Sequence, residues 1–324
     1  MPALATLTAR AKSASRQVFD DFSRTLPHEA WIADRFGLAS RPAADSSPPI
    51  GIAAMRSHGL QPDTGVWFAL QPVHIHIARD HLILTDTRQL ALPEQESRAL
   101  FDTAKPLFDE AGRELRYGDA HVWFVRADDW ADLDTATPDA ACGHNIDIWM
   151  PKGTGERAWR KLQNEVQMHW HTHAINAGRE MRGVKPVNSL WLWGGAPASM
   201  AAAASPYAAV FNLPGWISAL APFAPAQFRD YAAAETIATA AAHGLVTLDT
   251  LIEPAFATDW HAWLERMHQL ENDWFAPLLA GLKSGKLDQA RLILTHGTGL
   301  AELSIHRRSL HKFWVKPSLQ GLAP

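Results

Sequence analysis

The chain has 324 residues, of which 47% are hydrophobic and 20% are charged, and its formal net charge is −4. This composition is typical of a folded globular protein, and the length allows one large domain with insertions or two domains. The weak negative charge excludes a general electrostatic attraction to nucleic acid or to an anionic membrane, so we expect neither as a partner.

The first half of the chain predicts helices followed by short strands. An amphipathic helix opens the sequence, a second helix covers about residues 30–36, and a Pro- and Ser-rich linker follows over residues 37–51. Beyond the linker, short β-branched and aromatic runs separated by turns predict antiparallel strands, with a helix beginning near Pro93. These runs are GVWFAL (65–70), VHIHIAR (73–79), HLILTD (81–86), ELRYG (114–118) and HVWFVRA (121–127).

The second half predicts helices that alternate with strands. After a long loop over residues 127–155, apolar residues recur every three or four positions from Glu156 to Met181, which predicts one continuous helix with one buried stripe. The stripe consists of Trp159, Leu162, Val166, Trp170, Ala174, Ala177 and Met181. Further elements are strands at NSLWLW (188–193), LVTL (245–248) and ARLILT (290–295), a helix over about residues 259–282, and a basic helix at SIHRRSLHKFWVK (304–316).

Three segments follow from this pattern. Residues 1–50 hold the N-terminal helices and the linker, and residues 51–155 form an α+β subdomain. Residues 156–324 form one half of an α/β core that ends in the basic C-terminal helix. Because strands alternate with helices in this last segment, we expect the core sheet to be parallel.

The single cysteine, Cys142, excludes an intramolecular disulfide and a cysteine-rich zinc site. No signature of a thiol enzyme surrounds it, so we expect an inert thiol. The N-terminal segment contains no apolar run long enough for a signal peptide or a membrane span. We therefore expect a cytoplasmic protein.

Two groups of histidines are candidate metal ligands. On one continuous helix His169 and His173 share a face, but the segment offers no third ligand and no HExxH arrangement. His74 and His76 alternate on a strand and share a face as well. The alternatives for both groups are histidines held by hydrogen bonds on the surface or in the core, and for His173 contact with an anion.

The segment over residues 169–195 also suggests an anion site. Asn176 and Arg179 share a helix face, and the turn that follows brings Asn188 back toward them. A guanidinium group with side-chain amides suits phosphate or carboxylate recognition. His173 and Gly194, whose backbone N–H lies in a Gly-Gly pair after an apolar run, complete the candidate ligand-binding set. The structural alternative is that Arg179 caps the helix and Asn188 orders the turn.

The same segment resembles a family of proteobacterial proteins named after the Rpf pathogenicity regulators, which are often described as cofactor-independent phosphoglycerate mutases. Other segments match that family in the same order, and the resemblance covers roughly residues 60–316. These segments are QPVHIHIARDHLILTD (71–86), IDIWMPKGTGERAWRKLQNEVQ (146–167), ENDWFAPLLAGLKSG (271–285) and RRSLHKFW (307–314).

A pattern within residues 169–195 is similar to NxxRxxxGxxPxN of the archaeal-type phosphoglycerate mutases, which belong to the alkaline-phosphatase-like superfamily. It is formed here by Asn176, Arg179, Gly183, Pro186 and Asn188. The resemblance implies an α/β fold: an alkaline-phosphatase-like core with a parallel sheet, an inserted α+β subdomain, and here an N-terminal helical segment. It also places the two asparagines and the arginine on the substrate side.

The metal-binding part of that family's pattern is missing from this sequence. Members carry an early Asp-Gly motif, a Ser or Thr nucleophile and later Asp and His ligands, because two cations activate the nucleophile and neutralise the phosphoryl group. Here Asp249, Asp259 and His261 lack the family's spacing, and His296 stands where an Asp-His pair is expected. Two-metal phosphoryl transfer is therefore not supported.

The main hypothesis is a phosphoglycerate-mutase-like protein without the phosphoryl-transfer site, which binds a small phosphorylated or carboxylated anion or serves in regulation, and which needs no cofactor. One alternative is an active metal-dependent phosphomutase or phosphatase, with Mn or Zn held by a rearranged set of ligands. That set would be drawn from His169, His173, Asp249, Asp259, His261 and His296. A further alternative is a module that binds a protein partner through the basic, Trp-bearing C-terminus.

Overall fold

The structure is a computed structural model that describes residues 1–38, 45–79, 81–200, 204–228 and 243–322. The chain divides into two compact units, a central unit of residues 22–203 and a terminal unit of residues 1–21 with 204–324. These bounds differ from the boundaries near residues 50 and 155 that we expected. Part of the expected linker, residues 39–44, lies outside the described residues.

The central unit contains a four-stranded antiparallel sheet in the order β5-β6-β2-β7. Its strands are β5 (Leu115–Tyr117), β6 (Trp123–Arg126), β2 (Val66–Val73) and β7 (Ser189–Pro197). A separate antiparallel hairpin consists of β3 (Ile75–Ala78) and β4 (His81–Leu84). The strands predicted between residues 65 and 127, and the strand at 188–193, are therefore confirmed.

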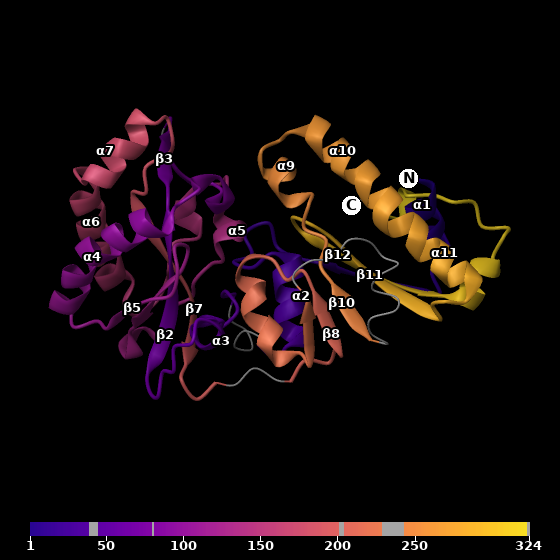
Figure 1. Ribbon diagram of the computed structural model, residues 1–324, viewed down its shortest axis with the longest axis horizontal. Coiled ribbons are helices and arrows are strands. Elements are labelled where there is room, and N and C mark those ends of the chain that lie inside the picture. Colours follow the sequence, from indigo (N-terminus) through magenta and orange to yellow (C-terminus); the bar gives the residue numbers. More distant parts are fainter. Residues whose placement is uncertain (39–44, 80, 201–203, 229–242, 323–324) are drawn as a thin grey trace. The chain divides into compact units, whose positions relative to one another are not determined.

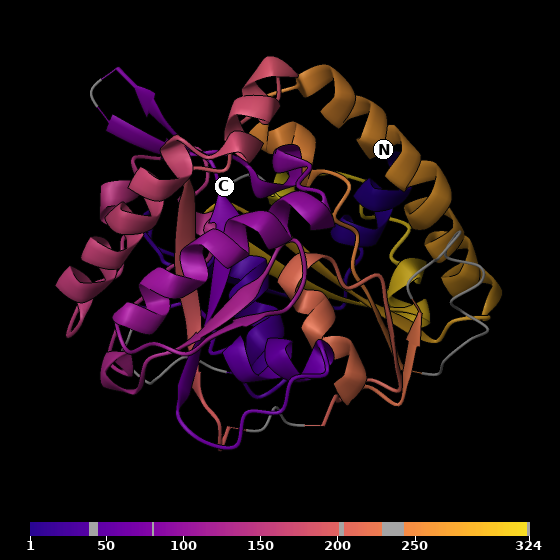
Figure 2. The same cartoon turned by 60° about the vertical axis from the view of Figure 1, so that its left-hand side comes forward.

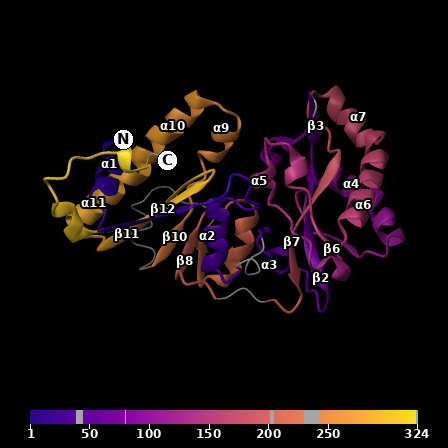
Figure 3. The same cartoon turned by 180° about the vertical axis from the view of Figure 1, so that it is seen from behind.

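Helices cover both faces of this sheet. On one face lie α4 (Glu94–Glu110) and α6 (Glu156–His171), and on the other lies α3 (Gly51–Ser57) (Figures 1 and 3). The core between the sheet and the first two helices is built from large apolar side chains. They include Phe68, Leu70, Leu100, Trp123, Trp159, Val166, Trp170 and Leu190. Two shorter helices, α2 (Pro27–Arg35) and α5 (Pro138–Ala141), complete the unit.

The predicted continuous helix over residues 156–181 is wrong, because the chain breaks it into α6 and α7 (Ala174–Met181). At the break His173 caps α7, with its Nδ1 accepting a hydrogen bond from the backbone N–H of Ile175 (3.2 Å). The buried apolar stripe consequently ends at Trp170, and Met181 is 85% exposed. The buried face of α7 is polar instead and consists of Asn176 and Arg179.

The terminal unit contains two three-stranded sheets, both visible in Figure 2. The larger one is antiparallel, in the order β1 (Ser13–Val18), β12 (Gly299–His306) and β11 (Gln289–His296). The smaller one is parallel, in the order β10 (Gly244–Val246), β8 (Ala209–Phe211) and β9 (Ala226–Phe228). The chain is thus a mixed α/β protein, as predicted. In its described part, however, the expected parallel core sheet is not found, because the parallel pairs of named strands are limited to these three short strands.

The helices of the terminal unit pack around its antiparallel sheet. They are α1 (Pro2–Ala9), α9 (Ile252–Phe256), α10 (Trp260–Leu270) and α11 (Ala276–Ser284), with a π-helical turn at Glu271–Phe275. Within that turn the buried carboxylate of Glu271 accepts hydrogen bonds from the backbone N–H groups of Ala3 (2.6 Å) and Leu4 (3.2 Å). A carboxylate therefore caps the positive end of α1. Of the described helices, none is long and apolar enough to cross a membrane.

The predicted basic helix over residues 304–316 is also wrong. The chain continues as strand β12 up to His306 and then forms a short 3-10 turn, Arg307–His311. The strand is favoured because Leu303 and Ile305 alternate toward the buried core while their backbones pair with β11. The basic and aromatic side chains are therefore not arranged on one helical face.

We predict that an ion pair in the central unit makes its stability depend on pH. His58, which follows α3, lies with Nε2 at 3.0 Å from Asp119 Oδ2, and its Nδ1 is 2.8 Å from the Ala54 carbonyl oxygen. Two acceptors thus face the two N–H groups of the protonated imidazole. The hydrogen bond to Asp119 raises the pKa of His58 above its ordinary value, although burial opposes it.

Because the folded-state pKa of His58 is raised, its contribution to stability is fully present below the unfolded pKa of about 6.5. It is lost as the pH rises through the folded-state pKa. Urea unfolding of the wild type and of His58→Gln at several pH values should show a difference in unfolding free energy that shrinks toward alkaline pH. A difference that stays constant across this range would contradict the assignment.

Candidate functional site

Arg179 anchors the region in which we expected an anion site. Its side chain on α7 is only 1% exposed. The Nε atom donates to the carbonyl oxygen of Lys185 (2.7 Å), Nη1 donates to Glu96 Oε2 (2.6 Å), and Nη2 donates to the carbonyl oxygen of Leu90. The guanidinium group therefore ties α7 to α4, to the end of η1 (Thr87–Leu90) and to the turn that leads into β7.

The two asparagines of the candidate set hold the same turn from other sides. Asn176, 3% exposed, donates from Nδ2 to the carbonyl oxygens of Trp170 (2.9 Å) and Val187 (2.8 Å) and accepts from the N–H of Val187 (2.8 Å). Asn188 bonds the backbone of Ile75 in both directions, at 2.8 Å and 2.7 Å. Both asparagines thus use their polar groups on backbone atoms, which favours the structural alternative, and the ligand-binding set stays a prediction.

The turn over residues 182–188, which we call the 182–188 turn, carries an excess of positive charge. Glu96 is the carboxylate that contacts both neighbouring guanidinium groups, Arg179 at 2.6 Å and Arg182 at 2.5 Å. Lys185 donates only to the neutral amide oxygen of Gln89 (3.0 Å). Within this group three cationic side chains therefore face one carboxylate. Arg182 and Lys185 are exposed, so an anion in solvent can reach them.

Two imidazoles lie beside the 182–188 turn. His74 Nδ1 donates to the carbonyl oxygen of Pro186 (2.8 Å), and the ring of His74 stacks on that of His76 with centroids 6.1 Å apart. Burial lowers the pKa of His74, and the charges of Lys185, His76 and Arg179 lower it further, against the hydrogen bond to Pro186. The charges of these neighbouring groups therefore oppose protonation of His74.

The other candidates lie outside this group. His173 caps α7, and its Nε2 contacts Thr103 Oγ1 (3.1 Å). His169 lies exposed on α6. Because the helix breaks between His169 and His173, the two histidines do not share the helix face that we expected. Gly194, with φ of +71°, donates its N–H to Ser47 Oγ (2.9 Å), and a Cβ there would lie 2.6 Å from a methyl carbon of Ile50. Packing therefore explains this glycine.

Sequence reasoning missed Glu96, Lys185 and His74 as members of this region. The sequence analysis gave Glu96 and Lys185 no role, and it named His74 only as a partner of His76. No local spacing connects α4, the 182–188 turn and β3. The available signal was the number of basic residues between positions 179 and 185, which includes Arg182 and Lys185.

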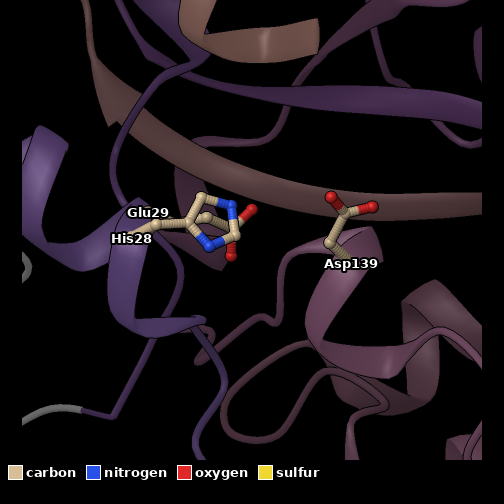
Figure 4. Close-up of side chains that lie close together, drawn as sticks. All are labelled: His28, Glu29 and Asp139. Carbon is tan, nitrogen blue, oxygen red and sulfur yellow. The ribbon is translucent and has the colours of Figure 1, made fainter. Parts of the chain in front are cut away.

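Within the described part of the terminal unit, no group of three potential metal ligands forms among Asp249, Asp259, His261 and His296. Asp259 caps α10 by accepting from the N–H of Ala262 (3.0 Å), and Asp249 accepts from Asn212 Nδ2 (3.2 Å). Within the described part of the chain, the group of three potential ligands that does come together contains none of the expected residues. It consists of His28, Glu29 and Asp139, which lie in the central unit (Figure 4).

The C-terminal segment presents two large apolar side chains to solvent. Phe313 is 81% exposed and Trp314 is 69% exposed, with ring centroids 5.1 Å apart. The neighbouring Lys312 donates to the carbonyl oxygen of Ala11 (2.9 Å), which fixes the segment to the N-terminal part of the terminal unit. A protein partner for this segment stays a prediction.

Comparisons with known proteins give structural similarities at low identity. No protein-family model matches the sequence, and a search of curated proteins finds no match. The chain is similar in structure to the cofactor-independent phosphoglycerate mutase from Thermoplasma acidophilum DSM 1728, with a TM-score of 0.37 and 13% identity, over 93% of this chain and 81% of that chain. It is similar also to the PH0037 protein from Pyrococcus horikoshii, with a TM-score of 0.46 and 12% identity, over 94% and 80% of the two chains. At these TM-scores the similarities support no conclusion about chemistry, and membership of the Rpf-type family stays a prediction.

We predict that Arg179 and Arg182 differ sharply in their contribution to stability, although both contact Glu96. Arg179→Ala removes the partner of a largely buried carboxylate and of two carbonyl groups, so we expect a loss of about 3–5 kcal/mol in unfolding free energy. Arg182, whose side chain is 55% exposed, is the matched control, and Arg182→Ala should cost about 0–1 kcal/mol. Urea denaturation of both variants measures the contrast; equal losses would refute the structural role of Arg179.

We also predict that Cys142 is unreactive in the folded protein. Burial raises the pKa of its thiol to about 12, and the charges of Asp86 and Asp139 add to the shift. Because the thiolate is the reactive form, a disulfide reagent such as DTNB should label the native protein slowly and the urea-unfolded protein at once. Rapid stoichiometric labelling in native buffer would show that the thiol is accessible.

Proposed function

We propose that this chain is a phosphoglycerate-mutase-like binding protein for a small phosphorylated or carboxylated anion, in a regulatory role, and that it does not perform two-metal phosphoryl transfer. The observation that carries the proposal is the unbalanced charge at the 182–188 turn. There Arg182 and Lys185 face solvent beside Arg179, with Glu96 as the carboxylate between the guanidinium groups.

The chemistry of the turn supports an anionic ligand of small size. Exposed guanidinium and ammonium groups bind phosphate and carboxylate oxygens through charge-assisted hydrogen bonds. Arg179 takes part through its charge and by holding the turn, since its hydrogen bonds are directed at protein groups.

This assignment gives the ligand contacts to other residues than those that the sequence analysis favoured. Asn176, Asn188 and Arg179 position the turn, whereas Arg182 and Lys185 would contact the anion. Replacing Arg179 would therefore mix a loss of fold with a loss of binding. The exposed pair is the better place to test the proposal.

We expect 3-phosphoglycerate and inorganic phosphate to bind the EDTA-treated protein, as measured by isothermal titration calorimetry and by the upward shift of the thermal unfolding midpoint. The double variant Arg182→Gln, Lys185→Gln should weaken binding by about tenfold or more, since hydrogen bonds to charged groups contribute about 1.5–3 kcal/mol each. Raising the salt concentration should weaken binding in the wild type as well.

A matched double variant, Arg160→Gln with Lys161→Gln on the exposed face of α6, removes the same charge elsewhere and should bind like the wild type. Equal weakening in both double variants would indicate a general charge effect and would reject the site. Stabilisation by 3-phosphoglycerate only in the presence of manganese would instead favour the metal-dependent enzyme.

A further inference from the structure

Three side chains with metal-ligating atoms meet in the central unit, and the sequence suggested none of them as a ligand. His28 and Glu29 lie in the first turn of α2, and Asp139 lies in α5. One ligand atom from each lies within 4.8 Å of the other two. Figure 4 shows the imidazole and the Glu29 carboxylate on one side and the Asp139 carboxylate facing them across a short gap.

The imidazole of His28 is partly exposed and lies close to the two carboxylates. One of its ring nitrogens lies within 4.8 Å of a carboxylate oxygen of Glu29 and of Asp139. Burial lowers the pKa of His28, and the charge of Asp139 opposes this shift. A neutral imidazole offers a nitrogen lone pair, which is the form that binds a metal ion.

Glu29 is fixed in place at the same point. It is 1% exposed, and its Oε2 accepts hydrogen bonds from the N–H of Leu26 (2.9 Å) and from the hydroxyl of Thr137 (2.6 Å). The same hydroxyl accepts from the N–H of Ala140 (3.2 Å) and so caps α5. One carboxylate therefore sets the distance between the helix that carries His28 and the helix that carries Asp139.

Asp139 is oriented by a second set of contacts. Both of its oxygens accept from Arg88, at 3.0 Å each, and Arg88 Nε also lies 2.8 Å from Asp86 Oδ1. The other oxygen of Asp86 is buried and has no hydrogen-bond partner among the described residues. The network around Asp139 thus contains one buried carboxylate oxygen without a hydrogen-bond partner among the described residues, where buried polar groups are normally paired.

We propose that His28, Glu29 and Asp139 form a binding site for one divalent cation of the manganese and zinc type. One nitrogen with two carboxylate oxygens is a donor set that these ions accept. Ligand atoms about 2.2 Å from an ion lie at most ~4.4 Å apart, so the observed cluster needs only small side-chain rotations to close on the ion. Supporting contacts of the kind that Arg88 and Thr137 make are typical of protein metal sites.

The site is independent of the anion proposal, because it shares no residue with the 182–188 turn. It is also distinct from the ligand set of the enzyme alternative, which included His169 and His173. The inference concerns cation binding and assigns no reaction to the ion. Occupation would tie α2 to α5 and thereby stabilise the central unit.

The test is calorimetric titration of the EDTA-stripped full chain with ZnCl₂ and, separately, with MnCl₂. We expect one ion per chain and an upward shift of the thermal unfolding midpoint. His28→Gln and Asp139→Asn should each weaken binding by more than about tenfold, the lower range of the loss seen when even supporting residues are removed. His169→Gln is the matched control and should bind like the wild type.

A measurement on the unaltered protein keeps the proposal testable if a variant fails to fold. Pulsed electron paramagnetic resonance of the Mn²⁺-loaded wild type should show one directly coordinated imidazole nitrogen. The proposal is overturned by any of three results: no stoichiometric binding of either ion, unchanged affinity in a folded His28→Gln variant, or no nitrogen coupling to Mn²⁺. Loss of binding in His169→Gln would place the ion elsewhere and overturn it as well.

Discussion

A buried guanidinium group needs hydrogen-bond acceptors in place of water. At Arg179 this requirement fixes much of the structure of the candidate region. Its acceptors come from α4, from the end of η1 and from the 182–188 turn. If any of these hydrogen bonds were lost, a charged group or a carbonyl group would stay buried without a partner, which costs several kcal/mol. The position of the turn is therefore fixed by a polar side chain and not by apolar packing.

This constraint decides which cations remain available to solvent. Since Arg179 is directed inward and shares Glu96 with Arg182, the carboxylate cannot neutralise both guanidinium groups and the nearby ammonium group of Lys185. The charge left over lies at the surface of the turn. The residue that holds the turn and the residues that could hold a ligand are thus different residues of the same short segment.

The sequence predicted the strands of the central unit well, because alternation of apolar and polar residues is a local signal that survives without tertiary context. It failed at the break after His171, where the apolar spacing continues through Ala174 and Ala177 although their side chains end in solvent. A helix cap by His173 depends on Thr103 of α4 and cannot be recognised from spacing alone. The C-terminal segment failed for a related reason, since pairing with β11 outweighs a basic amphipathic pattern that would also suit a helix.

The candidate site residues were likewise predictable only where they lie close together in the sequence. That Asn176 and Arg179 contact the turn before Asn188 was predictable, because they precede Asn188 by twelve and nine residues and the chain turns between them at Gly183 and Pro186. Glu29 and Asp139 lie more than one hundred residues apart in sequence, and neither has neighbours at metal-ligand spacing, so no sequence pattern could join them.

In this protein, the hydrogen-bond partners of a buried polar group, more than its residue type, distinguish groups that hold the fold from candidate ligand-binding groups. Arg24 is buried like Arg179, and its guanidinium group donates to the carbonyl oxygens of Asp134, Ile148, Trp149 and Met150. Both arginines have protein acceptors on their guanidinium nitrogens and so hold the backbone in place. Asp86 is the opposite case, since its Oδ2 is buried and has no hydrogen-bond partner among the described residues. A buried group whose hydrogen bonds are met within the chain stabilises the fold, whereas one whose bonds are unmet is the place to expect a ligand.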